Sequence, residues 1–180
     1  MKKGKFVISL DFELVWGVFD HITLNEKIAY FDNTRKVIPL MLACFEKHEI
    51  KVTWATVGML FNENWEEWLA NLPDEKPTYT NLKLDAYAYG LEHRSSGLDR
   101  LFFAPDLIRL IQSTPGQELA THTYSHYYCL ESGQTKKQFE CDLDLAKKMA
   151  TQFGATLHSL VFPRNQWNPD YLVSCQERGI

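Results

Sequence analysis

The 180-residue chain has no apolar run of transmembrane length and no N-x-S/T glycosylation sequon. Its four cysteines form neither a C-x-x-C pair nor a zinc-knuckle pattern, so we expect reduced thiols rather than disulfides or cysteine metal ligands. The chain also lacks an excess of positive charge. The net charge of −4 and the pI of about 5.9 argue against a nucleic-acid surface or a basic membrane face. What remains is the composition of a globular domain, 45% apolar and 23% charged.

The N-terminus resembles the start of a secretory signal peptide but does not continue as one. Residues 1–5 are basic, and the apolar run over 6–10 stops at Asp11. A signal peptide needs roughly 7–15 apolar residues at this place. We therefore expect a cytoplasmic protein that does not span a membrane.

Apolar runs and helical periodicities alternate along the chain and predict an α/β fold. Buried strands are expected at 6–10, 52–57, 118–120 and 157–162, and helices near 25–48, 64–69, 103–111, 135–153 and 168–178. Pro39 is expected to kink the first helix or to mark its start. Periodicity fades over 73–104, which we interpret as an irregular insertion. This order of elements implies parallel strands joined by crossover helices.

Two histidines carry the strongest functional signal. His122 and His126 lie four residues apart, just after the strand expected at 118–120, and imidazoles at this separation can converge on one metal ion. Asp11 and Glu13 follow the first strand, and Arg164 follows the last. In parallel α/β folds functional groups gather at the carboxyl ends of the strands, so we expect these five residues to form one site.

The residue types fit metal-dependent hydrolysis. A catalytic zinc typically has three protein ligands and an open position, which two histidines and one carboxylate satisfy. The metal can polarise a carbonyl and lower the pKa of bound water, while a second carboxylate takes the proton. Either Asp11 or Glu13 could be the ligand and the other the base, with a nearby arginine holding the base ionised. In the plainer interpretation the histidines form local hydrogen bonds, the acids cap turns and Arg164 pairs with any acid.

Four segments then resemble the motifs of one family in the expected order. They are I-S-L-D-F-E-L-V-W-G (8–17), V-T-W-A-T-V-G (52–58), E-L-A-T-H-T-Y-S-H (118–126) and V-F-P-R-N-Q (161–166). Together they resemble the polysaccharide deacetylase family, also called the nodulation-deacetylase homology or carbohydrate esterase 4 group. The H-(S/T)-x-x-H pattern, here H-T-Y-S-H, is the most specific of them, and the resemblance covers nearly the whole chain.

The resemblance implies a distorted (β/α)7-type barrel that removes N- or O-acetyl groups from sugars with a divalent metal, usually Zn²⁺. It also implies that His122, His126 and Glu13 are metal ligands and that Asp11 is the catalytic base. Two motifs depart from the family pattern, because Asp-Phe-Glu replaces adjacent aspartates and Phe-Pro-Arg-Asn-Gln replaces Arg-x-Pro-Tyr. Arg164 could steady Asp11, or its segment could supply backbone N–H groups to an oxyanion hole. The form of the first motif resembles the branch linked to bacterial surface-polysaccharide or O-antigen loci.

The length predicts a single catalytic-type domain, 1–180, that is only the N-terminal part of a barrel. A complete (β/α)8 barrel has roughly 250 residues, and the segment 176–180 has the pattern of a helix end followed by a new strand. The family's late histidine, a general acid, is not recognisable and would follow Ile180. Two alternatives to a sugar deacetylase stay open: a non-glycan C–N (ureide or amide) hydrolase of the same fold, and a catalytically idle carbohydrate-binding module.

Overall fold

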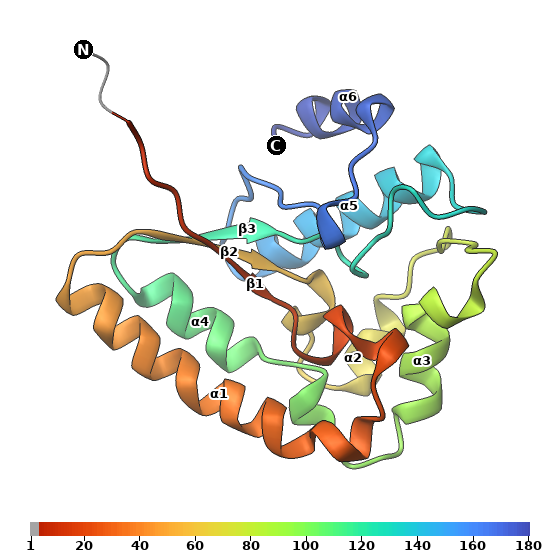
Figure 1. The fold of residues 1–180 in the computed structure, drawn as a ribbon. Coiled ribbons are helices and arrows are strands. Elements are labelled where there is room, and N and C mark those ends of the chain that lie inside the picture. The colour runs from red at the N-terminus through yellow and green to blue at the C-terminus, as the bar shows by residue number, and fades with distance from the viewer. Residues whose placement is uncertain (1–3) are drawn as a thin grey trace.

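The structure, a computed structural model, describes residues 4–180, so the first three residues of the signal-like N-terminus lie outside the described part. Three parallel strands form its sheet in the order β1–β2–β3 (Figure 1). They are β1 (Ser9–Phe12), β2 (Val52–Thr56) and β3 (Gln117–Thr121). Phe12 pairs with Thr56, and Thr56 pairs with Thr121. The three strands therefore end level with one another at one edge, as a parallel α/β fold predicts.

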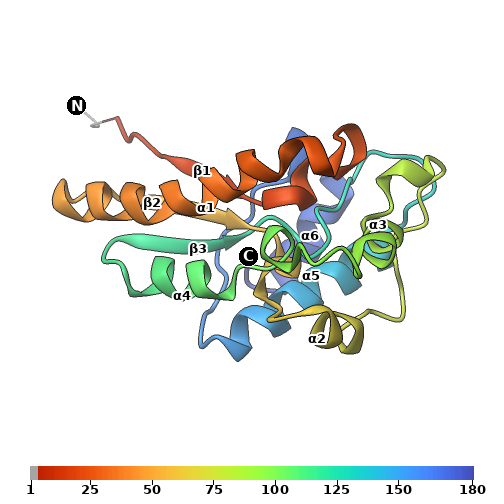
Figure 2. The same cartoon turned by 90° about the horizontal axis from the view of Figure 1, so that it is seen from below.

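Six α-helices accompany the sheet in residues 4–180. They are α1 (Leu24–Lys47), α2 (Trp65–Ala70), α3 (Ala86–His93), α4 (Pro105–Ser113), α5 (Lys136–Gln152) and α6 (Pro169–Glu177). Figure 1 shows α1 and α4 side by side below the sheet and α6 above it, and Figure 2 gives the view from below. The carboxyl ends of the strands point toward the side of the molecule where α2 and α3 lie (Figure 1).

Local sequence signals explain where most helices begin. Pro105 is the first residue of α4, where its missing N–H costs no intrahelical bond. Thr135 and Gln138 form a reciprocal capping box at the start of α5. Helix α1 begins at Leu24 and runs through Pro39 to Lys47, so the alternative start near Pro39 is wrong. The other predicted helices are confirmed within a few residues of their expected bounds.

Two expected strands differ from the structure. The first begins at Ser9 rather than at residue 6, and Phe6 and Val7 are 90% and 76% exposed. Its neighbour β2 begins only at Val52, and the pairing with β2 reaches back to the Ile8 carbonyl, so Phe6 and Val7 have no strand to pair with. The strand expected at 157–162 is reduced to a single bridge between Leu160 and Thr121.

The expected irregular insertion over 73–104 is partly helical. Helix α3 begins after Asp85, whose side chain accepts hydrogen bonds from two backbone N–H groups of the first turn. Tyr87 is buried and stacks on Trp68, and a Cβ at Gly90 would lie 2.8 Å from the same indole ring. Helix α3 therefore belongs to the aromatic core that lies beside the strand ends.

The described residues form an open sheet, so the expected barrel is not closed within 4–180. A three-stranded parallel sheet with flanking helices is compatible with part of the expected barrel. None of the helices in the described part of the chain is long and apolar enough to cross a membrane.

Candidate metal centre

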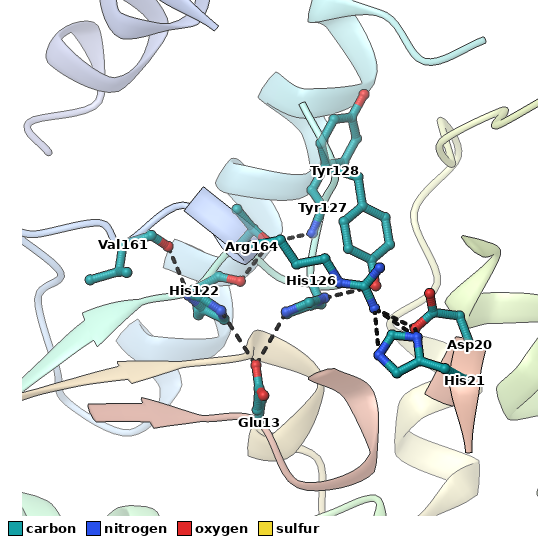
Figure 3. Close-up of polar contacts among 10 residues, drawn as sticks. Glu13, Asp20, His21, His122, His126, Tyr127, Tyr128, Val161 and Arg164 are labelled. Carbon is teal, nitrogen blue, oxygen red and sulfur yellow. Dashed lines mark hydrogen bonds and ion pairs between the residues drawn. The ribbon is translucent and has the colours of Figure 1, made fainter. Parts of the chain in front are cut away.

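Glu13, His122 and His126 converge at the level ends of β1 and β3. One Glu13 carboxylate oxygen, Oε2, lies 3.4 Å from His122 Nε2 and 3.2 Å from His126 Nε2. The three candidate ligand atoms all lie within 4.8 Å of one another. Figure 3 shows both imidazole rings directed at the carboxylate from the side opposite β1. Such a spacing allows one cation to contact all three.

Glu13 reaches the histidines because the chain leaves the strand there. Its ψ of −19° ends the extended backbone of β1, and a short 3-10 helix (Leu14–Gly17) follows. Trp16 anchors this turn, since its indole N–H donates to the Phe102 carbonyl at 2.7 Å and its ring is fully buried. The turn passes beneath the carboxylate: a Cβ at Gly17 would lie 1.9 Å from Glu13 Cδ. Only glycine leaves room for this Glu13 conformation.

His122 has one ring nitrogen occupied and one available. Its backbone N–H donates to the Thr56 carbonyl at 2.9 Å, which carries the β2–β3 pairing one residue past the strand. Its Nδ1–H donates to the Val161 carbonyl at 2.8 Å. This assigns the proton to Nδ1 and leaves a lone pair on Nε2, which is buried and has no hydrogen-bond partner among the described residues. A backbone carbonyl behind the ring is the usual support of a metal-binding histidine.

His126 is presented by a turn with unusual backbone geometry. Thr123 and His126 have φ values of 63° and 57°, a region that non-glycine residues seldom occupy. His126 Nδ1 lies 3.0 Å from the Tyr128 hydroxyl, so Nε2 faces Glu13. The ring is 2% exposed. Backbone strain of this kind is often found at functional sites.

The electrostatics of the centre favour the forms that bind a cation. Burial raises the pKa of Glu13, but the two imidazoles beside the carboxylate outweigh this effect and lower the pKa to about 2. Burial lowers the pKa of His126, and this effect is larger than the increase caused by the Glu13 carboxylate. At neutral pH Glu13 is therefore a carboxylate, and one carboxylate with two imidazoles is a donor set that suits zinc.

Arg164 lies beside the centre and not in it. Its guanidinium donates to Asp20 Oδ1 at 2.5 Å, contacts His21 and covers the Tyr128 ring at 4.8 Å from the centroid (Figure 3). Asp20 is nearly buried, with 8% of its side chain exposed. The acid that Arg164 steadies is thus Asp20 rather than Asp11, and through Tyr128 this ion pair backs His126.

Asp11 stands apart from the three converging groups. It lies on β1 opposite Ala55, its side chain is exposed, and it makes no side-chain hydrogen bond within the described part of the chain. The structure therefore brings Glu13, and not Asp11, to the two histidines. Asp11 thus lies on β1, two residues before Glu13, as an exposed carboxylate.

Three further residues support the centre and were not singled out in the sequence. Tyr128 follows His126 by two residues, Asp20 pairs with Arg164 from 144 positions away, and Asp142 of α5 lies beneath the histidine turn. Asp142 had a detectable signal, because it is a charged residue among apolar positions of an amphipathic helix. Nothing in the local sequence marks the other two.

An α/β domain with a carboxylate and two histidines at its strand ends defines a class of candidate metallohydrolases. The model of the polysaccharide deacetylase family matches residues 13–180. The chain therefore belongs to this family, which supports a deacetylase-type function and implies an acetylated carbohydrate substrate. Comparison with curated proteins and with solved structures gave no match.

Proposed function

We propose that the protein is a metal-dependent deacetylase that hydrolyses an N- or O-acetyl group on a sugar or polysaccharide precursor. The observation that carries the proposal is the approach of His122 Nε2 and His126 Nε2 to a single Glu13 oxygen, at 3.4 and 3.2 Å. The family match over residues 13–180 supports the same reaction. The unpartnered Nε2 of His122 supports a cation there, since a buried lone pair without a donor is unfavourable.

Glu13, His122 and His126 would hold the metal, and their mixture of one oxygen and two nitrogen donors suits Zn²⁺ best. A divalent cation held there supplies Lewis acidity, which polarises the acetyl carbonyl and lowers the pKa of a water molecule. The protein orients the donors itself. The Val161 carbonyl fixes the proton of His122 on Nδ1, and Tyr128 contacts Nδ1 of His126.

Asp11 is the residue we propose as general base. Glu13 is engaged with the histidines, whereas Asp11 is exposed and free of hydrogen bonds among the described residues. A carboxylate two residues before Glu13 that no other described residue engages is a candidate to take the proton of the attacking water. We propose a positioning role for Arg164, whose ion pair with Asp20 packs on Tyr128 behind His126.

The substrate we propose is an acetylated amino sugar or an O-acetylated sugar of a surface polysaccharide. The Asp-Phe-Glu-Leu-x-Trp-Gly form of the first motif supports this choice over other glycans. A panel of N-acetylglucosamine oligomers, O-acetylated xylan and a ureide separates the sugar deacetylase from a C–N hydrolase of the same fold.

The proposal is tested by acetate release with Zn²⁺ or Co²⁺ added. Wild-type protein is expected to release acetate from at least one acetylated sugar, and Asp11→Asn to retain metal while losing roughly 10²- to 10⁴-fold in rate. Glu13→Gln and His126→Ala are expected to lose the metal itself, as measured by elemental analysis. Asp144→Asn, an exposed change on α5, is the matched control and should match wild type.

Two outcomes would contradict the proposal. One is metal-loaded protein that releases no acetate from any member of the panel while it binds sugar, which would favour the idle binding module. The other is an Asp11→Asn variant that turns over at the wild-type rate, which would remove Asp11 from the mechanism.

A further inference from the structure

Asp142 is a carboxylate inside the protein. It lies on α5 among apolar side chains and is 1% exposed. Burial raises the pKa of Asp142 to about 6, although three hydrogen bonds lower it. A buried carboxylate is unfavourable unless its oxygens accept hydrogen bonds, so its partners show what it is there to hold.

All of its partners belong to the turn between the two histidines. Asp142 Oδ1 accepts from the Tyr124 N–H at 2.6 Å, and Oδ2 accepts from the Ser125 N–H at 3.1 Å. The Ser125 hydroxyl donates to Oδ2 as well. The left-handed conformations of Thr123 and His126 flank these two N–H groups, so the strained turn is stabilised through its donors.

The carbonyls of the turn are held by the segment that follows β2. The Gly58 and Met59 N–H groups donate to the carbonyls of Thr123 and Tyr124, at 2.9 and 3.0 Å. A Cβ at Gly58 would lie 2.8 Å from the Tyr124 Cα, so this approach is close. The short 3-10 helix after β2 (Gly58–Phe61) donates to the carbonyls of the turn, and Asp142 accepts from its N–H groups.

We propose that Asp142 is a positioning residue of the metal centre: by fixing the Tyr124–Ser125 turn it sets the separation and direction of His122 Nε2 and His126 Nε2. The inference rests on the proposed function, because it concerns the same three ligands. Asp142 itself touches neither imidazole, and it acts through the backbone that connects them. Residues that orient metal ligands from outside typically change metal affinity 10- to 100-fold when they are replaced.

The test uses Co²⁺ as the probe, since its visible absorption reports ligand geometry and its affinity is measured by competition with a chelator. Asp142→Asn keeps the shape but turns one acceptor into a donor that faces the Ser125 N–H. Folded Asp142→Asn is expected to bind Co²⁺ roughly 10- to 100-fold more weakly than wild type, with a changed absorption band. If this variant does not fold, Ser125→Ala is the deciding variant, because it removes only the hydrogen bond from the Ser125 hydroxyl to Asp142. It is also expected to bind Co²⁺ more weakly and to show a changed absorption band.

Two controls on the same helix separate positioning from general stability. Asp144→Asn makes the same chemical change at an exposed site, and Met149→Ala destabilises the core two turns away. Both are expected to keep the wild-type Co²⁺ spectrum and affinity, although Met149→Ala lowers the thermal midpoint.

The inference is overturned if the deciding variant has the wild-type Co²⁺ affinity and spectrum. It is also overturned if Met149→Ala weakens Co²⁺ binding as much as the deciding variant does. In those cases wild type still binds Co²⁺, and the proposed function stands. Wild-type protein that binds no Co²⁺, or whose binding survives His122→Ala/His126→Ala, overturns the metal centre together with the role of Asp142.

Discussion

At the scale of single residues, Gly17 controls where the Glu13 carboxylate lies. In Gly17→Ala the added methyl would overlap the carboxylate, 1.9 Å from Cδ and 2.1 Å from Oε1. The carboxylate ends a flexible side chain, so we expect it to move while the fold survives. Metal affinity, measured by chelator competition, should fall at least about tenfold. Substitutions outside the ligand set that displace a ligand typically weaken metal binding by roughly 10- to 100-fold. Gly4→Ala, where the methyl meets nothing within 4 Å, is the control. Wild-type affinity in Gly17→Ala would show that Glu13 is not a ligand.

The lowered pKa of Glu13 predicts how the stability of the metal-free protein depends on pH. Its folded-state pKa of about 2 lies below the ordinary 4.5, so the ionised carboxylate stabilises the native state. This stabilisation is fully present above about pH 4.5 and is lost as the pH falls toward 2. At about 1.4 kcal/mol per pKa unit, the stabilisation amounts to at most about 3.5 kcal/mol.

Glu13→Gln removes this titration. In urea unfolding with a chelator present, we expect the wild type to exceed Glu13→Gln in free energy of unfolding above pH 4.5, with the difference shrinking toward pH 2. Glu46→Gln, at an exposed position on α1, should follow wild type at every pH. A difference that stays constant between pH 2 and 6 would contradict the depressed pKa.

At the scale of elements, the segment before α3 supports the loop that follows His126. The Tyr79 hydroxyl accepts a hydrogen bond from the Tyr128 N–H at 2.9 Å, and the Tyr79 ring is 5% exposed. Thr80 N–H donates to the Ser132 carbonyl at 2.8 Å. The region expected to be an irregular insertion therefore holds the loop that carries Tyr128.

Tyr79→Phe tests this support. It leaves the buried Tyr128 N–H without an acceptor, so we expect a loss of about 1–3 kcal/mol in the free energy of unfolding. The measurement is urea denaturation at neutral pH. Tyr30→Phe removes the same hydroxyl from an exposed residue and should change stability by less than about 0.5 kcal/mol. Equal stability of the two variants would mean that the segment does not support the loop.

The elements that sequence predicted well are those with local causes. Helix α4 has Pro105 at its start, and α5 has the Thr135 capping box and an apolar face. Helix α3 was missed because its burial depends on Trp68, which is distant in sequence. The strand expected at 157–162 is reduced to one bridge because apolar composition does not reveal how far pairing extends. The Val161 N–H still donates to the Thr121 carbonyl of β3, but the Val161 carbonyl accepts from the His122 ring.

At the scale of the whole molecule, parallel topology made the gathering of Glu13, His122 and His126 predictable. Residues that directly follow parallel strands meet at one edge whatever their distance in sequence. The groups that support them do not follow this rule. The Asp20–Arg164 pair and the carboxylate of Asp142 depend on side-chain packing, which alternation and spacing do not encode.

The placement of β2 between β1 and β3 has a consequence for the order of folding. Glu13 and the histidines belong to the two outer strands, so they meet only after both parallel pairings with β2 have formed. Each pairing joins segments about 40 or more residues apart, and such non-local contacts form slowly because long loops must close first. The centre is therefore assembled late in folding, and a cation bound there would slow unfolding more than it would speed folding.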